Sequence, residues 1–134
     1  MSITLAEAQK AIEASVAKAK ELGVAVAVAV LDDQARIVAV ARMDGSRFLF
    51  LPEAAQGKAM ATVLWGGQHS GALQERAVMP IMDAVKEMYG GKVIYQQGAV
   101  AVKRGDAVIG AVGAGGASGQ QDEDIAAAGA AAIS

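Results

Sequence analysis

Apolar and polar positions repeat along this chain with two different periods, and these periods predict its helices and strands. Between Thr4 and Leu22, apolar residues recur three or four positions apart, with Glu and Lys on the opposite side. Thr4 and Glu7 also have the spacing of a capping box, in which each caps the other's backbone N–H. The pattern predicts a first helix over these residues, and Gly23 then ends it.

The next segment changes to a period of two. From Val24 to Leu31, valine alternates with alanine, which places the valines on one face of a strand and the alanines on the other. Because both faces are apolar, the pattern predicts a central strand that is covered on both sides, with an alanine face flat enough for a helix to lie close. Polar turn residues precede a second strand from Arg36 to Arg42, so we expect a hairpin.

The middle of the chain returns to helical spacing. Pro52 suits the first turn of a helix, which should reach Trp65 and end at two glycines. We expect residues 68–73 to form a loop. More helix is expected from 74 to 89, where Pro80 cannot donate a backbone hydrogen bond and splits it.

The last third predicts three strands, at residues 92–95, 99–103 and 107–113. A glycine-rich turn follows, and Ser118 with Gln121 again has capping-box spacing at the start of the last helix. Hairpins with helices before, between and after them predict an α/β (α+β) fold, a five-stranded antiparallel sheet with helices on both faces. With 134 residues, we expect one domain over residues 1–134.

Composition narrows the classes of function. The net charge of −2, without any cluster of Lys and Arg, argues against nucleic acid and an anionic membrane surface as partners. The chain has no Cys, so it has no disulfide or thiolate ligand, and it has no signal-peptide pattern or membrane-spanning run. We therefore expect a cytoplasmic protein. Its core of Ala, Val and Gly also suits subunit packing.

One stretch carries the most specific pattern. Val108 to Glu123 runs VIGAVGAGGASGQQDE, with Arg42-Met43-Asp44-Gly45 upstream and Lys58-Ala59 in the second helix. Together these segments resemble the GlcG/HbpS family, which includes the C-terminal domain of PduO-type proteins. The resemblance implies a profilin-like antiparallel sheet and assembly into dimers or larger homo-oligomers. It also implies a small-molecule ligand, since some members bind haem or related corrinoids and others accompany glycolate or diol metabolism.

The chain departs from that family pattern in two places. Gly98-Ala99-Val100-Ala101 stands where Gly-Val-Pro-Ile or a similar run is common. The segment from Trp65 to Tyr89 has no recognisable match. A ligand specificity that resides in this segment would be this protein's own.

The glycine-rich turn before the last helix can be interpreted in two ways. Free N–H groups at a helix start attract phosphate, but the acidic residues at 122–124 already complement the helix dipole and would repel it. The turn also lacks a Walker lysine and the Rossmann spacing. We therefore expect a tight strand-to-helix turn in which Gly115 and Gly116 line a small-ligand pocket.

His69 is the only histidine, which excludes a multi-histidine metal site within one chain. Since free histidine has a pKa of about 6.5, this residue type can serve as a general base. His69 can also be one axial ligand to haem iron if haem binds, or a solvated loop residue. Glu75 can complete an acid/base pair with it, or lie on a solvated helix face. Trp65 offers an aromatic pocket wall nearby.

Three charged residues are candidates for ligand binding. Arg42 can hold a carboxylate through two hydrogen bonds, although with Asp44 it can equally set the turn after the second strand. Lys58 lies on a mostly apolar helix, where its stem can be buried while its amine projects into a cleft. Together they favour a carboxylate-binding pocket over a phosphate site.

Two hypotheses about function follow. In the first, the chain binds haem or another flat or carboxylate-bearing organic molecule, in a pocket made by the glycine turn, the second helix and the loop from Trp65 to Gln74. In the second, it is a cofactor-independent lyase, isomerase or hydrolase that acts on a small acid or carbonyl compound. That enzyme would use His69 or Glu75 as its base, with Arg42 or Lys58 orienting the substrate.

Overall fold

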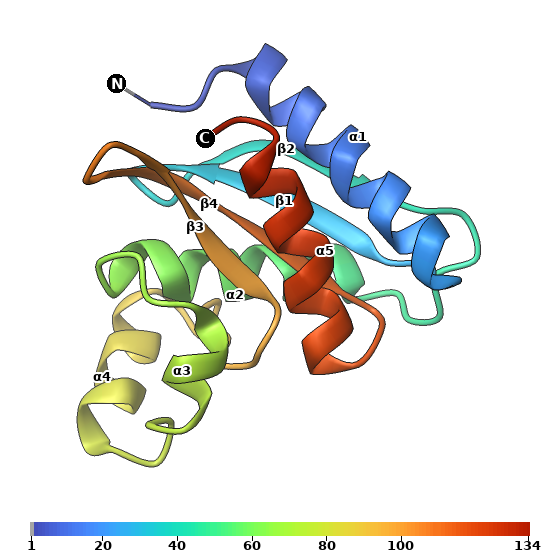
Figure 1. Cartoon of the computed structure of the whole chain (residues 1–134). Coiled ribbons are helices and arrows are strands. Elements are labelled where there is room, and N and C mark those ends of the chain that lie inside the picture. Colours follow the sequence, from blue (N-terminus) through green and yellow to red (C-terminus); the bar gives the residue numbers. More distant parts are fainter. Residues whose placement is uncertain (1) are drawn as a thin grey trace.

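The computed structural model describes residues 2–134, and in this part of the chain it contains five helices and four strands (Figure 1). In chain order they are α1 (Leu5–Leu22), β1 (Ala27–Asp32), β2 (Ile37–Arg42), α2 (Leu51–Leu64), α3 (Ser70–Gln74), α4 (Pro80–Met88), β3 (Ala99–Arg104), β4 (Ala107–Gly115) and α5 (Gly119–Ala131). The strands form one sheet in the order β2-β1-β4-β3, and every neighbouring pair is antiparallel. The predicted α+β class is confirmed, but the sheet has four strands and not five.

The segment that was predicted as the fifth strand, residues 92–95, follows an extended path without joining the sheet. Its backbone instead bonds to α2, where the N–H of Ile94 donates to the carbonyl of Gly57 at 3.1 Å. Val93 and Tyr95 are buried on the same side of this segment. These two buried side chains pack the segment against α2.

Strand β1 is central, as its alternating sequence predicted. Its valine side chains belong to the same buried cluster as apolar residues of α1 and α5, namely Ala8, Ala11, Ala19, Ile125, Ala126 and Ala130. Its alanines Ala27 and Ala29 pack against Leu51 and Ala55 of α2. Helices therefore cover both faces of the sheet, with α1 and α5 on one side and α2 on the other (Figure 1).

Glycine on β4 allows α2 to lie unusually close to the sheet. A Cβ atom added at Gly113 would lie 2.2 Å from the carbonyl oxygen of Ala55 and 3.1 Å from the Cβ of Ala59. Contacts below 3 Å between these atoms would force the helix away from the strand. The small residues on both elements thus set the spacing of the two layers.

Several helix ends in the structure agree with the capping and proline signals in the sequence. Thr4 and Glu7 cap the start of α1 reciprocally, and Gly23 ends it in the left-handed conformation with φ of 73°. Pro80 begins α4, as its missing N–H allows.

The prediction of a loop over residues 68–73 is wrong in part, because α3 begins at Ser70. The side chains of Ser70 and Leu73 on this short helix are buried. Across residues 2–134, no helix is long and apolar enough to cross a bilayer.

Candidate functional site

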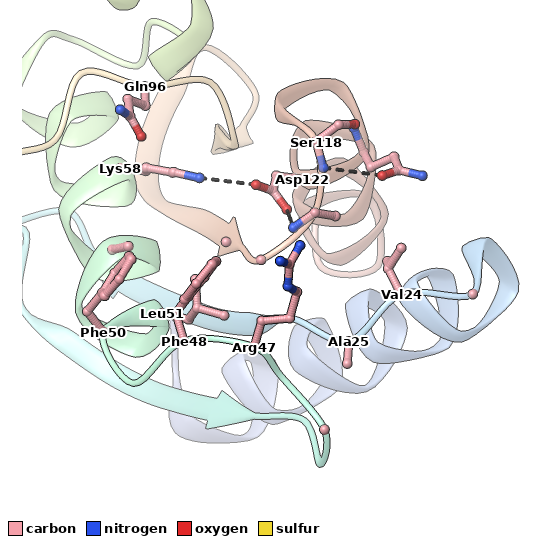
Figure 2. Close-up of a pocket in the computed structure, with 17 residues that line it drawn as sticks. Val24, Ala25, Arg47, Phe48, Phe50, Leu51, Lys58, Gln96, Ser118 and Asp122 are labelled. Atoms are coloured by element: carbon pink, nitrogen blue, oxygen red, sulfur yellow. Dashed lines mark hydrogen bonds and ion pairs between the residues drawn. The ribbon is translucent and has the colours of Figure 1, made fainter.

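A cleft of about 720 Å³ lies where the end of β4, the start of α2 and the start of α5 come together (Figure 2). The segment between α1 and β1 and the loop after β2 complete its walls. Its lining residues are Gly23, Val24, Ala25, Gly45, Arg47, Phe48, Phe50, Leu51, Ala54, Lys58, Gln96, Gly115, Gly116, Ala117, Ser118, Gln121 and Asp122. Its volume falls within the range of small-molecule sites, roughly 300–1,000 Å³.

A buried ion pair forms the inner end of this cleft. The Lys58 ammonium lies 3.2 Å from Oδ2 of Asp122 and donates to the carbonyl of Ala114 at 3.0 Å. Lys58 is 6% exposed and Asp122 is 2% exposed. Since Lys58 is on α2 and Asp122 is on α5, the pair joins helices from opposite faces of the sheet around the end of β4 (Figure 2).

Glycine makes this connection possible. A Cβ atom at Gly98 would lie 2.9 Å from both Cδ and Nζ of Lys58, so any side chain there would occupy the path of the lysine. At Gly115, an added Cβ would lie 3.6 Å from Nζ. The glycine-rich turn therefore leaves room for a charged side chain to pass from one layer to the other.

Asp122 also holds the glycine-rich turn in place. Its Oδ1 accepts a hydrogen bond from the N–H of Ala117 at 3.0 Å. Burial raises the pKa of Asp122 above its ordinary value, although the Lys58 charge and the backbone N–H groups of Ala117 and Gly116 oppose this effect. The backbone N–H groups of the turn are thus directed at a carboxylate of the protein, which agrees with the argument against a phosphate cradle.

The mouth of the cleft is basic and aromatic. The Arg47 side chain points into it (Figure 2), with its guanidinium carbon 5.1 Å from the centre of the Phe48 ring. Phe48 and Phe50 stack with ring centres 5.4 Å apart. Within residues 2–134, Arg47 has no carboxylate partner within 4 Å. The cleft therefore presents one uncompensated positive charge beside two aromatic rings.

Two helix starts add to this charge. Leu51 and Ala54 of the first turn of α2 line the cleft, and no side chain caps that helix. Glu53 in the same turn offsets part of the helix dipole, but it lines a different depression. The start of α5 also lines it, but there Ser118 and Gln121 cap each other's N–H groups. Because the start of a helix carries about half a positive charge, α2 favours an anion here more strongly than α5 does.

Lys58, Gly115 and Gly116 were predicted from the sequence, and the structure brings these three together in the cleft. Arg47, Phe48 and Asp122 were not predicted as site residues. A signal was present for the first two, because the only phenylalanines of the chain directly follow Arg47 in the run Arg-Phe-Leu-Phe. Asp122 gave no such signal, because its role depends on the approach of Lys58 from a distant helix.

The other candidate residues lie elsewhere. Arg42 and Asp44 line a shallow depression with Val16 and Lys20 of α1. Neither residue lines the cleft, although Gly45 of the same turn does.

His69 and Glu75 flank α3, which lies outside the cleft. The Nδ1 atom of His69 is 4.0 Å from the Glu123 carboxylate, and its side chain is 56% exposed. Glu75 is exposed at the end of α3, and Trp65 donates to the hydroxyl of Tyr95 at 3.3 Å. The pocket that was expected to include the Trp65 to Gln74 loop is therefore formed instead by the loop after β2.

These features define a small α+β protein with one ligand-sized cleft that has a basic, aromatic mouth. The chain belongs to the family described as "Haem degrading protein HbpS-like", whose model matches residues 3–131. This confirms the resemblance that the sequence motifs indicated. A comparison with curated proteins found no match.

Solved structures give the same assignment. Klebsiella pneumoniae protein ORFY is similar with a TM-score of 0.87 and 28% identity, over 98% of this chain and 90% of that chain. A double mutant of Streptomyces reticuli HbpS has a TM-score of 0.86 and 30% identity, over 100% and 88%. PduOC, solved as a haem complex, has a TM-score of 0.85 and 28% identity, over 99% and 96%.

Proposed function

We propose that this protein binds a small, planar organic molecule that carries a carboxylate, and that the cleft holds it. The observation that carries this proposal is Arg47, which points into the cleft beside Phe48 with no carboxylate of the protein within 4 Å. A guanidinium binds a carboxylate through two parallel hydrogen bonds, and a planar ligand can stack on the aromatic pair. The uncapped start of α2 adds a favourable field for the same anion.

Haem is one candidate ligand, because PduOC was solved as a haem complex and the family is described as haem-degrading. Arg47 and the stacked pair of Phe48 and Phe50 offer contacts for the propionates and the flat ring of haem. However, no His, Cys, Met or Tyr residue is among those that line it, so this chain alone does not fit axial ligation of the iron there. His69, the expected axial ligand, lies in a separate depression with Val100 and Lys103.

Calorimetric titration with benzoate tests the proposal, with uncharged benzamide as the matched ligand. We expect saturable binding of benzoate, and a loss of at least about 10-fold in affinity in Arg47→Gln, because a hydrogen bond to a charged group contributes about 1.5–3 kcal/mol. Arg42→Gln is the matched control, since it removes an exposed arginine from a different depression. Equal binding of benzamide, or an unchanged affinity in Arg47→Gln, would refute the carboxylate site.

A haemin titration separates haem from other planar acids. If haem occupies the cleft, the Soret band shifts with saturation, Arg47→Gln weakens the binding and His69→Ala leaves it unchanged. A loss in His69→Ala alone would place haem at the other depression.

Assembly and location remain proposals from the sequence. We propose a cytoplasmic homo-oligomer built from one domain per chain. Large apolar side chains on the surface support self-association, among them Leu49 at 89% and Val78 at 93% exposure. Light scattering on the purified protein tests this, and a monomer at all concentrations would contradict it.

A further inference from the structure

We propose that Lys58 is a covalent binding site, where its side-chain amine condenses with the carbonyl group of a small aldehyde or oxo acid held by Arg47. The inference rests on the proposed function, because it uses the same cleft and the same contact with the ligand carboxylate. It adds a chemical class to that function, namely acids that also carry a reactive carbonyl group.

The position of the Lys58 amine is the first argument. Lys58 is the one lysine among the residues that line the cleft. An ammonium has three N–H groups, and protein atoms accept from two directions, at Ala114 and Asp122. Gly115 has no side chain to stand between the cleft and the amine, and a Cβ atom there would touch Nζ at 3.6 Å. The approach that the proposal needs is along the glycine-rich turn, where Lys58 and Gly115 both line the cleft.

The second argument is the proton acceptor beside it. An ammonium is not a nucleophile, so the amine must first lose a proton. The Asp122 carboxylate lies 3.2 Å away and is almost fully buried. Burial raises the pKa of Asp122, which makes its carboxylate a better proton acceptor than a carboxylate in water.

The reaction needs no oxidant or reductant. Asp122 takes a proton from the ammonium, and the amine lone pair then forms a bond to the carbonyl carbon. Asp122 returns the proton to the carbonyl oxygen, takes a second proton from the nitrogen and passes it to the hydroxyl group, which leaves as water. Overall, the ammonium and the carbonyl compound give a protonated C=N bond and one water, and Asp122 ends as the carboxylate it was.

Reductive trapping tests this assignment. The protein is incubated with 4-carboxybenzaldehyde and cyanoborohydride, which reduces a C=N bond to a stable secondary amine, and is then mapped by peptide mass spectrometry. We expect the label at Lys58 ahead of every exposed lysine, and competition by benzoate. The methyl ester of the same aldehyde, which lacks the carboxylate, should label Lys58 more slowly.

Variants separate the chemistry from folding. Lys58→Arg keeps the charge and should abolish the label, whereas Lys92→Arg removes an exposed lysine and should not. Asp122→Asn should slow trapping at least about 10-fold, as expected for loss of a proton-transfer group. The position of the label in the protein without substitutions is mapped directly, so this result does not depend on whether any variant folds.

The outcomes distinguish this inference from the proposed function. Saturable benzoate binding without label at Lys58, or with label spread evenly over exposed lysines, overturns the covalent role and leaves the carboxylate site standing. In that case the pair with Asp122 only ties the two helical layers together. Failure of both binding and labelling overturns both proposals.

Discussion

The cleft and the segment from Trp65 to Tyr89 contrast in where they place their polar side chains. In the cleft, Lys58 and Asp122 are buried and paired across the sheet. In the other segment, Glu75 and Arg76 are exposed just after α3. Large apolar side chains farther along this segment, such as Val78 and Met88, are also exposed. Glycines explain the difference, since those around Lys58 give a charged side chain a route into the interior.

The contrast shows where specific chemistry can arise in this fold. A buried charge is retained only with a partner and satisfied hydrogen bonds, so its geometry is fixed. An exposed charge next to water is free to move and contributes little to stability. The segment from Trp65 to Tyr89 was expected to have no family match and to hold the specific chemistry. The expectation of no match is wrong, because the family model covers residues 3–131. The polar groups with fixed geometry lie instead beside the glycine-rich motif.

The largest difference between the two regions should come from removing one charge in each. Lys58→Met leaves Asp122 buried without its partner, and we expect it to lower the free energy of unfolding by about 3–5 kcal/mol. Glu75→Ala removes an exposed charge and should change it by less than about 0.5 kcal/mol. Urea denaturation measures both. Equal effects would show that the buried pair is not structural, and recovery in Lys58→Met/Asp122→Leu would confirm that the cost lies in the orphaned carboxylate.

A methyl group should cost more stability against α2 than in α3. Gly113→Ala places a Cβ against the backbone of α2 and should destabilise the protein by about 1–3 kcal/mol. Gly71→Ala would meet side-chain atoms only, at 2.9 Å from Cγ of Gln97 and 3.2 Å from Oε1 of Glu123, so it should cost less because side chains shift more easily than backbone. Thermal unfolding compares them. A drop in stability of the same size in Gly71→Ala would contradict the difference in packing.

Helix capping gives a smaller pair of effects. Ser118→Ala removes the cap of α5 and should cost about 1 kcal/mol. Met79 stands at the uncapped start of α4 in an extended conformation, so Met79→Ser should stabilise the protein by up to about the same amount. Chemical denaturation of each single variant measures these changes in the free energy of unfolding. A loss of stability in Met79→Ser would mean that packing of the Met79 side chain contributes more than the new cap.

Acid should affect two carboxylates in opposite directions. The pKa of Glu7 is lowered by the Thr4 backbone N–H and by Arg104, so its contribution to stability is present above its ordinary value of 4.5 and is lost as the pH falls. The pKa of Asp122 is raised by burial, so its proton-linked contribution is present below 3.8 and is lost as the pH rises through the raised value. Unfolding measured between about pH 3 and 7 for Glu7→Gln and Asp122→Asn checks these signs. If the free energy of unfolding changed with pH in the same way in both variants, the opposite signs predicted for Glu7 and Asp122 would be contradicted.

Much of the fold could be predicted because its signals are local. The capping boxes at Thr4 and Ser118 fix two helix starts through residues three positions apart. The alternation in β1 identified the central strand, because both faces of that strand are covered. The strand predicted at residues 92–95 was wrong, because the residue types of an extended segment do not show whether its backbone pairs with another strand or with Gly57 of a helix.

By itself, the sequence determined the family, the α+β class, the starts of α1, α4 and α5 and the glycine-rich turn, because each depends on residue types at short, fixed spacing. Only the tertiary structure decided which charges share a site. Lys58 and Asp122 are 64 positions apart and meet at 3.2 Å, whereas His69 and Glu75 are near each other in sequence and lie outside the cleft. Partners of this kind depend on how layers stack around the sheet. No local pattern carries that information. The space that admits the Lys58 side chain is made by Gly98 and Gly115, which are far from Lys58 in the sequence.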